Sequence, residues 1–132
     1  NTVSGKVQLA GVDFEVIDRG ESYDLAIPSL NVVYTHMLGK TTHSILTSAA
    51  HIEAFLQMLK EYQAAGYAMI LTSHSGPEGQ DAVAEKISYL NKTKEIMQQS
   101  KTADEFKAAM QATFPAYDGL NYLDMTAGFL YK

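Results

Sequence analysis

Apolar and polar residues alternate along the first third of the chain, which is the pattern of half-buried strands. Gly11, Gly20 and Pro28 interrupt this pattern and predict turns, since proline lacks the N–H that a central strand would use. We therefore expect several short strands within residues 5–36, before any helix. The alternating segments are Lys6–Leu9, Val12–Asp18, Tyr23–Ile27 and Leu30–Thr35.

From Ser48 the apolar residues recur with helical spacing instead, which predicts a helix over 48–65 that ends at Gly66. A short apolar strand over 68–73 follows and ends at His74. A strand, a crossover helix and a second strand form a βαβ unit, whose two strands are parallel. The sequence thus predicts that His36 and His74 lie at the same edge of the sheet.

Helical patterns return over 80–100 and 102–113, and Pro115 ends the second of them. The tail over 116–132 is aromatic and apolar, so we expect it to pack against the rest of the molecule. The chain needs no linker, and its length suits one domain over 1–132. The expected fold class is α/β, with about five strands and three helices.

Composition excludes several functional classes. Hydrophobic residues make up 46% of the chain, but no apolar run approaches the roughly 20 residues that cross a bilayer. The formal charge of −5 argues against nucleic acid as a partner. The sequence has no cysteine, which excludes disulfides, thiolate zinc sites and cysteine nucleophiles. No signal peptide is visible, so the default expectation is the cytoplasm.

Three segments together resemble the second half of the metallo-β-lactamase-like superfamily: 20–34, Thr35-His-Met-Leu-Gly-Lys-Thr-Thr-His43 and Ile70-Leu-Thr-Ser-His74-Ser-Gly-Pro77. The resemblance implies half of an αββα sandwich. It also implies that His74 corresponds to the last histidine ligand of the family's metal site, although Ser73 and Ser75 replace the usual glycines. His36 stands where the family has an acidic ligand, and the His-x-His-x-Asp-His motif does not occur in this chain.

Three histidines are candidate metal ligands: His36, His43 and His74. They could hold zinc at about 2.0–2.1 Å if the loop between the first two folds back. Glu21 and Asp24 are candidate carboxylate partners for these imidazoles. The competing interpretation is that the histidines orient turns through hydrogen bonds and that the protein has no cofactor. We assign no catalytic residue.

A half sandwich leaves one face of its sheet without cover. Such a face would expose several hundred Å² of apolar surface, which favours association. A second copy of the chain is the expected partner, and the chain's own last predicted helix and tail are the alternative cover. The candidate residues on this face are Val12, Phe14, Val16, Leu25, Ile27, Val32 and Tyr34.

Two functions follow as expectations. The first is a truncated, non-catalytic metallo-β-lactamase-like domain that forms a homodimer and can bind a small ligand. The alternative is a zinc-dependent hydrolase that uses His36, His43 and His74, alone or completed by a partner chain. A third possibility is that a separate chain carries the missing half of the fold.

Overall fold

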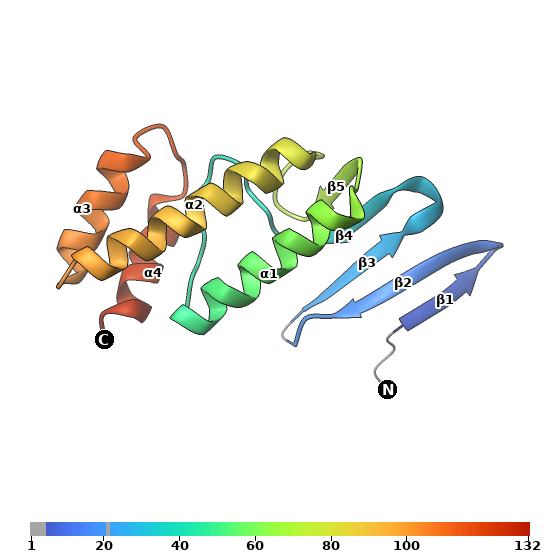
Figure 1. The fold of residues 1–132 in the computed structure, drawn as a ribbon, viewed down its shortest axis with the longest axis horizontal. Coiled ribbons are helices and arrows are strands. Elements are labelled where there is room, and N and C mark those ends of the chain that lie inside the picture. Colours follow the sequence, from blue (N-terminus) through green and yellow to red (C-terminus); the bar gives the residue numbers. More distant parts are fainter. Residues whose placement is uncertain (1–4, 21) are drawn as a thin grey trace.

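One mixed sheet of five strands, in the order β1-β2-β3-β4-β5, runs through the part of the chain that the structure describes. This structure is a computed structural model and describes residues 5–20 and 22–132. Strands β1 to β4 form an antiparallel meander, and β5 pairs in parallel with β4 (Figure 1). The bounds are β1 Gly5–Leu9, β2 Val12–Asp18, β3 Tyr23–Ile27, β4 Val32–Thr35 and β5 Met69–Thr72.

The first hairpin has a two-residue loop. Leu9 pairs with Val12, and the loop residues Ala10 and Gly11 both have positive φ, at 52° and 79°. Two positive φ angles make the loop follow the right-handed twist of the strands, and glycine adopts this conformation without strain. The turn thereby sets the register that puts Val12, Phe14 and Val16 on one face of β2.

Helix α1 Ala49–Ala65 is the crossover between β4 and β5. The Ser48 side chain caps its start by accepting a hydrogen bond from the His51 backbone N–H, and Gly66 ends it in the left-handed conformation. Thr35 then pairs with Thr72 at the ends of the two parallel strands. The predicted crossover is therefore present, and it brings His36 and His74 to one edge of the sheet.

Three more helices follow β5: α2 Gln80–Gln99, α3 Ala103–Thr113 and α4 Leu120–Leu130. The α/β fold class is confirmed, but the described residues form four α-helices where the sequence predicted three. The tail residues 120–130 form α4, which buries Leu123, Thr126 and Ala127. Threonine and alanine weaken the apolar stripe that would otherwise have predicted this helix.

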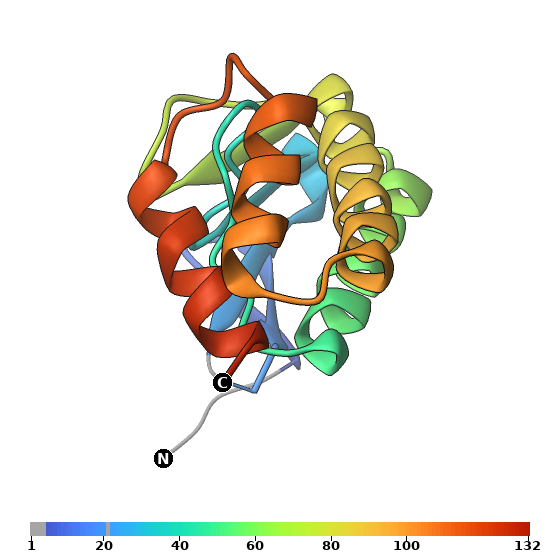
Figure 2. The same cartoon turned by 90° about the vertical axis from the view of Figure 1, so that its left-hand side faces the viewer.

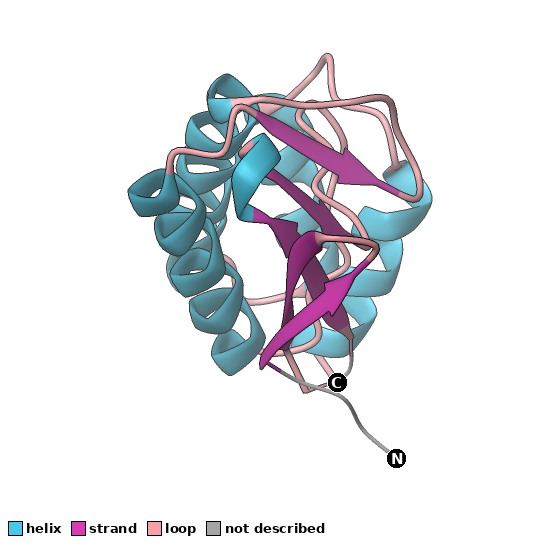
Figure 3. Ribbon diagram, turned by 90° about the vertical axis from the view of Figure 1, so that its right-hand side faces the viewer, coloured by secondary structure: helices cyan, strands magenta, loops and turns pink. Residues whose placement is uncertain are grey.

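The two faces of the sheet differ in cover. Ala26, Val33 and Ile70 are fully buried on the face that meets the helices. The strands stand in front of the helices in Figure 3 and behind them in Figure 2, so the helices lie on one side of the sheet. The β1–β2 hairpin extends beyond α1 and α2 (Figure 1), and its positions on the helix side are polar, as at Lys6 and Glu15.

The opposite face is apolar and only partly covered. Its side chains alternate along every strand with those that point to the helix side, and Tyr34 and Met69 remain 41% and 42% exposed. We call this surface the open sheet face. Its residues are Gly5, Val7, Leu9, Val12, Phe14, Val16, Asp18, Tyr23, Leu25, Ile27, Val32, Tyr34, Met69 and Leu71, of which only Asp18 is charged.

An irregular segment over 36–48 connects β4 to α1 and is tied to the end of the chain. The His43 backbone N–H donates to the Asp118 carbonyl at 2.9 Å, and the Asp118 N–H donates to the Thr41 carbonyl at 3.0 Å. Gly119 has φ +79°, and a Cβ at this position would lie 2.8 Å from Thr42 Cγ2. The close approach of the two segments therefore requires glycine.

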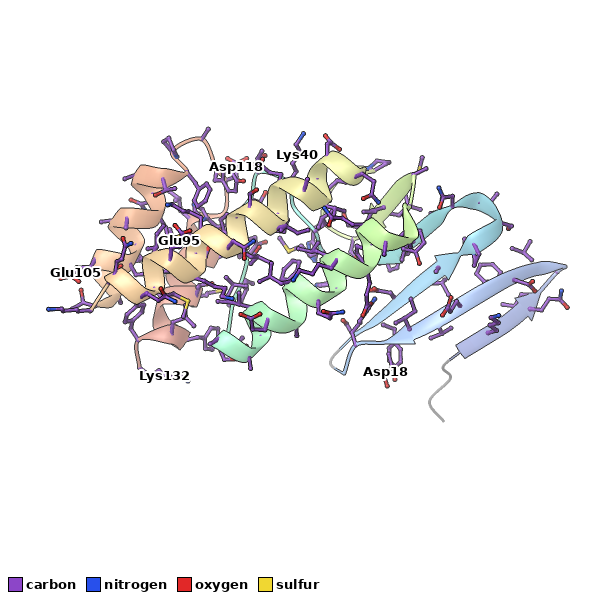
Figure 4. The ribbon with its side chains drawn as sticks, in the orientation of Figure 1. Asp18, Lys40, Glu95, Glu105, Asp118 and Lys132 are labelled. Atoms are coloured by element: carbon purple, nitrogen blue, oxygen red, sulfur yellow. The ribbon has the colours of Figure 1, made fainter. Side chains whose placement is uncertain are left out.

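Charged side chains are spread over the surface rather than gathered in one patch. Figure 4 shows Asp18 at the sheet end of the molecule and Glu105 at the opposite end, near α3. Within the described residues, no helix is long and apolar enough to cross a membrane.

Candidate functional site

His36 and His74 meet where β4 and β5 end. Their Nε2 atoms lie 3.2 Å apart, and their rings are nearly perpendicular, with centroids separated by 4.7 Å. Both side chains are exposed. The Ser73 backbone N–H donates to the His36 carbonyl at 3.1 Å, which fixes the spacing between the two segments that carry the rings.

The separation of 3.2 Å suits two chemical states. In the first, one imidazole donates its N–H to the unprotonated nitrogen of the other. In the second, both nitrogens bind one metal ion, because two tetrahedral ligands at about 2.0–2.1 Å from zinc lie roughly 3.3 Å apart. The distance between the two nitrogens therefore matches that of two ligands on one metal ion.

The Glu78 carboxylate holds the loop after His74 against the segment after His36. It accepts hydrogen bonds from the backbone N–H groups of Lys40, at 2.7 Å, and Gly39, at 3.3 Å. It also accepts from the Ser75 hydroxyl at 3.4 Å. Sequence analysis missed Glu78, because its partners are backbone groups 38 and 39 residues away, which leave no local pattern.

His43 lies in the core rather than beside the other two histidines. Its side chain is fully buried, and its Nδ1 lies 3.0 Å from the Tyr89 hydroxyl. Burial lowers its pKa, and the Lys86 charge lowers it further. The described residues contain no group of three histidine or carboxylate side chains that could hold a metal ion. The structure thus brings together His36 and His74 but not the predicted trio.

Lys86 is a buried cation next to His43. Its ammonium donates to the Thr42 carbonyl at 2.8 Å and to the Ser44 hydroxyl at 3.0 Å, and it lies 4.5 Å from the Tyr89 ring centroid. Burial lowers its pKa to about 8, against the opposing effect of nearby Glu78 and Glu85. The burial of this lysine could have been predicted from the sequence, because Lys86 lies on the same helical stripe as the apolar Val83 and Leu90.

Asp24 has partners other than an imidazole. Its Oδ2 accepts from Arg19 Nε at 2.9 Å and from the Tyr62 hydroxyl, while its Oδ1 is buried without a partner among the described residues. Burial, followed by the effect of the Asp24 carboxylate, raises the pKa of Tyr62 far above its usual range. The other predicted carboxylate, Glu21, lies outside the described residues.

A groove of about 500 Å³ starts beside His36 and follows α1. One wall comes from α1 and the other from the irregular segment 36–48, and Arg19 and Ser22 also contribute. The remaining lining residues are Thr35, Met37, Leu38, Ser44, Ile45, Thr47, Ser48, His51, Ala54, Phe55 and Met58. Its volume is within the range of about 300–1,000 Å³ that is usual for small-molecule sites.

Comparison with solved structures identifies the kind of fold. The sec-alkylsulfatase Pisa1 from Pseudomonas sp. matches with a TM-score of 0.59 and 16% identity, over 99% of this chain and 23% of that one. A double mutant of the same enzyme matches with a TM-score of 0.61 and 15% identity, over the same shares. A metallo-β-lactamase from Pontibacter korlensis is 12% identical, with a TM-score of 0.49, over 69% of this chain and 47% of that one.

No protein-family model matches the sequence, and no curated protein sequence matches it. The chain spans about a quarter of the length of the alkylsulfatase. At such low identities the matches establish the fold alone. The chain has an α/β fold found in part of metallo-β-lactamase-fold proteins, which confirms the resemblance predicted from sequence at this coarse level.

Proposed function

Because the fold is that of part of a metallo-β-lactamase-like protein, we propose that this chain is a non-catalytic lobe. In this proposal it pairs with a second copy of itself through the open sheet face and binds a small ligand in the groove beside His36. The observation that carries the proposal is the composition of the open sheet face. Among its paired positions, Gly5, Val16, Leu25, Tyr34 and Leu71 form a row across all five strands with no charged side chain.

A sheet face that meets water normally carries polar residues. On β1 and β2 this distribution is reversed: the helix-side positions beyond the helices are polar, and the open-face positions other than Asp18 carry no charged side chain. An apolar surface of this extent supports burial in an assembly. A standard interface buries about 800 Å² per partner, a scale that a five-stranded face with its rim can approach.

The scarcity of charge on this face, where Asp18 at the end of β2 is the one charged strand residue among the described positions, supports a second copy as the partner. Two identical charged faces would repel each other, whereas two identical, mainly apolar faces can stack about 10 Å apart. Asp18 is the last residue of β2 and is exposed, so the middle of the face buries no charge. A twofold arrangement also closes the assembly at two subunits. The burial of Leu25 and Tyr34 from both copies would then provide the driving force.

Sedimentation equilibrium at micromolar concentration tests the pairing. We expect a mass near twice 14.5 kDa for the unmodified chain and near 14.5 kDa for Leu25→Lys, which puts a charge in the middle of the face. Gln57→Lys, on the exposed side of α1, is the matched control and should remain dimeric. A monomeric unmodified chain would refute the pairing, and circular dichroism checks that each variant is folded.

The second candidate is a metal-dependent hydrolase, which the His36–His74 distance of 3.2 Å favours. A catalytic zinc usually has three protein ligands and one open position. The His36–His74 pair supplies only two of these three ligands, and His43 is hydrogen-bonded to Tyr89 in the core. This candidate therefore needs a third ligand from another chain, and we assign no hydrolytic step to the isolated chain.

Zinc content after purification without chelator separates the two candidates. Stoichiometric zinc that is lost in His74→Ala but retained in His51→Ala would favour the hydrolase. His51 is a suitable control because its ring is hydrogen-bonded to the Thr47 backbone N–H at the start of α1. The non-catalytic proposal expects no stoichiometric zinc in the isolated chain and no gain of hydrolysis on adding zinc.

A further inference from the structure

The groove along α1 has apolar side chains along its length and polar side chains at its ends. Ala54, Phe55 and Met58 line it on α1, and Ile45 lines it from the segment 36–48. The helix residues have the i, i+3 and i+4 spacing that puts side chains on one face. From His51 to Met58 this face is about 10 Å long, at about 1.5 Å per residue. An extended chain of about eight carbons has a comparable length.

The lining of the groove has one formal positive charge, at Arg19. Arg19 and two histidines line the groove, and none of its lining residues is a carboxylate. Arg19 uses Nε to bind Asp24, at 2.9 Å, and Nη1 to bind Glu61, at 2.6 Å. These bonds use two of the five N–H donors of the guanidinium and hold it in place. The two carboxylates together outweigh its single positive charge, so the guanidinium offers its remaining N–H donors rather than net positive charge to a ligand.

We infer that the groove binds a single-chain aliphatic carboxylate, with the alkyl chain along α1 and the carboxylate at the Arg19 end beside His36. This inference deepens the ligand-binding part of the proposed function and requires neither a metal ion nor a second copy. The alkyl chain would be buried against Phe55, Met58 and Ile45. The carboxylate would meet the free edge of the Arg19 guanidinium.

The six methionines of the chain provide an internal test by NMR of methyl-labelled protein. Met37 and Met58 line the groove, while Met69 lies on the open sheet face and Met125 is exposed on α4. With octanoate as the probe and EDTA present, the methyl signals of Met37 and Met58 should shift saturably and those of Met69 and Met125 should not. Shifts confined to Met69, or no shift at all, would overturn the inference.

Chain length and head group test the two halves of the ligand. Each methylene added between butanoate and octanoate should tighten binding about fourfold, because burial of one CH₂ is worth about that factor. Octanoate should bind more tightly than octyltrimethylammonium, whose head group has no oxygen to accept a hydrogen bond from the Arg19 guanidinium. Equal affinity for the two head groups, or for the different chain lengths, would contradict the assignment.

A matched pair of variants on α1 tests the location. Ala54→Phe adds a ring inside the groove and should weaken octanoate binding tenfold or more. Ala64→Phe adds the same ring on the exposed side of α1, outside the lining, and should leave the affinity unchanged. Because neither alanine is buried, both variants should fold. Unchanged affinity in folded Ala54→Phe would refute the site, whereas failure of dimerisation alone would refute only the proposed pairing.

Discussion

At the scale of single residues, Arg19 provides a comparison between two carboxylates that differ in burial. Asp24 is 1% exposed and Glu61 46% exposed, and both bind the same guanidinium. Asp24→Asn should lower the free energy of unfolding by about 3 kcal/mol, because it leaves a largely buried cation without its buried partner. Glu61→Gln should cost less than about 1 kcal/mol, as surface pairs do. Urea denaturation of both variants measures the difference, and equal effects would contradict this account.

Lys86 should make the protein more stable as pH rises. Its pKa is about 8 when folded and about 10.5 when unfolded, so between these values the unfolded chain holds a proton that the folded chain has lost. Stability therefore increases with pH in this window, by about 2 kcal/mol between pH 7 and 9.5. The raised pKa of Tyr89, about 12, opposes the trend only above pH 10.

Denaturation across pH 7–9.5 tests this prediction. Lys86→Met should remove the rise, since no amine then titrates in the core. Lys60→Met, on the exposed side of α1, should keep it. A rise of equal size in the Lys86→Met variant would show that another group is responsible.

Part of the candidate site could be predicted from the sequence. The positions of His36 and His74 follow from the ends of two parallel strands, and a crossover helix is a strong sequence signal. The position of His43 could not be predicted, because it depends on Tyr89 in α2 and on the approach of Asp118, 75 residues further along the chain. Long-range packing of this kind has no local pattern.

At the scale of elements, the strands could be predicted from local sequence patterns, whereas the helix formed by the tail could not. The strands and α1 have clear periods of two and 3.6 residues, and their predicted types hold. Helix α4 is held by the apolar contacts of Leu123 and Ala127 and also by buried polar contacts. The Thr126 hydroxyl accepts from the Leu46 N–H and donates to the Ser44 carbonyl, both at 2.8 Å. A threonine among apolar residues therefore marks a tertiary contact here.

Thr126→Val should lower the free energy of unfolding by about 2–4 kcal/mol, because it leaves two buried backbone groups unpaired while preserving shape. Thr113→Val on α3 is the control, since that hydroxyl is exposed, and its effect should stay within about 0.5 kcal/mol. Hydrogen exchange should also show faster exchange of the Leu46 amide in Thr126→Val. An unchanged rate would mean that this amide has another acceptor.

At the scale of the whole molecule, the open sheet face links stability to association. If copies pair through it, the folded dimer gains stability by mass action. The melting temperature should therefore rise with protein concentration for the unmodified chain. It should not change for Leu25→Lys, the charged variant of this face. Differential scanning calorimetry over a hundredfold concentration range measures both, and a constant melting temperature for the unmodified chain would exclude obligate pairing.

The hydrogen bonds between Thr126 and the segment 36–48 also bear on when this segment folds relative to the rest of the chain. They join residues 80 and 82 positions apart, so one wall of the groove gains its backbone partners only after most of the chain is available. Contacts of such long separation form late, because closing a long loop costs entropy before it gains contacts. The sheet and α1 can form before that point. This wall of the groove should therefore gain its backbone partners only once α4 has docked.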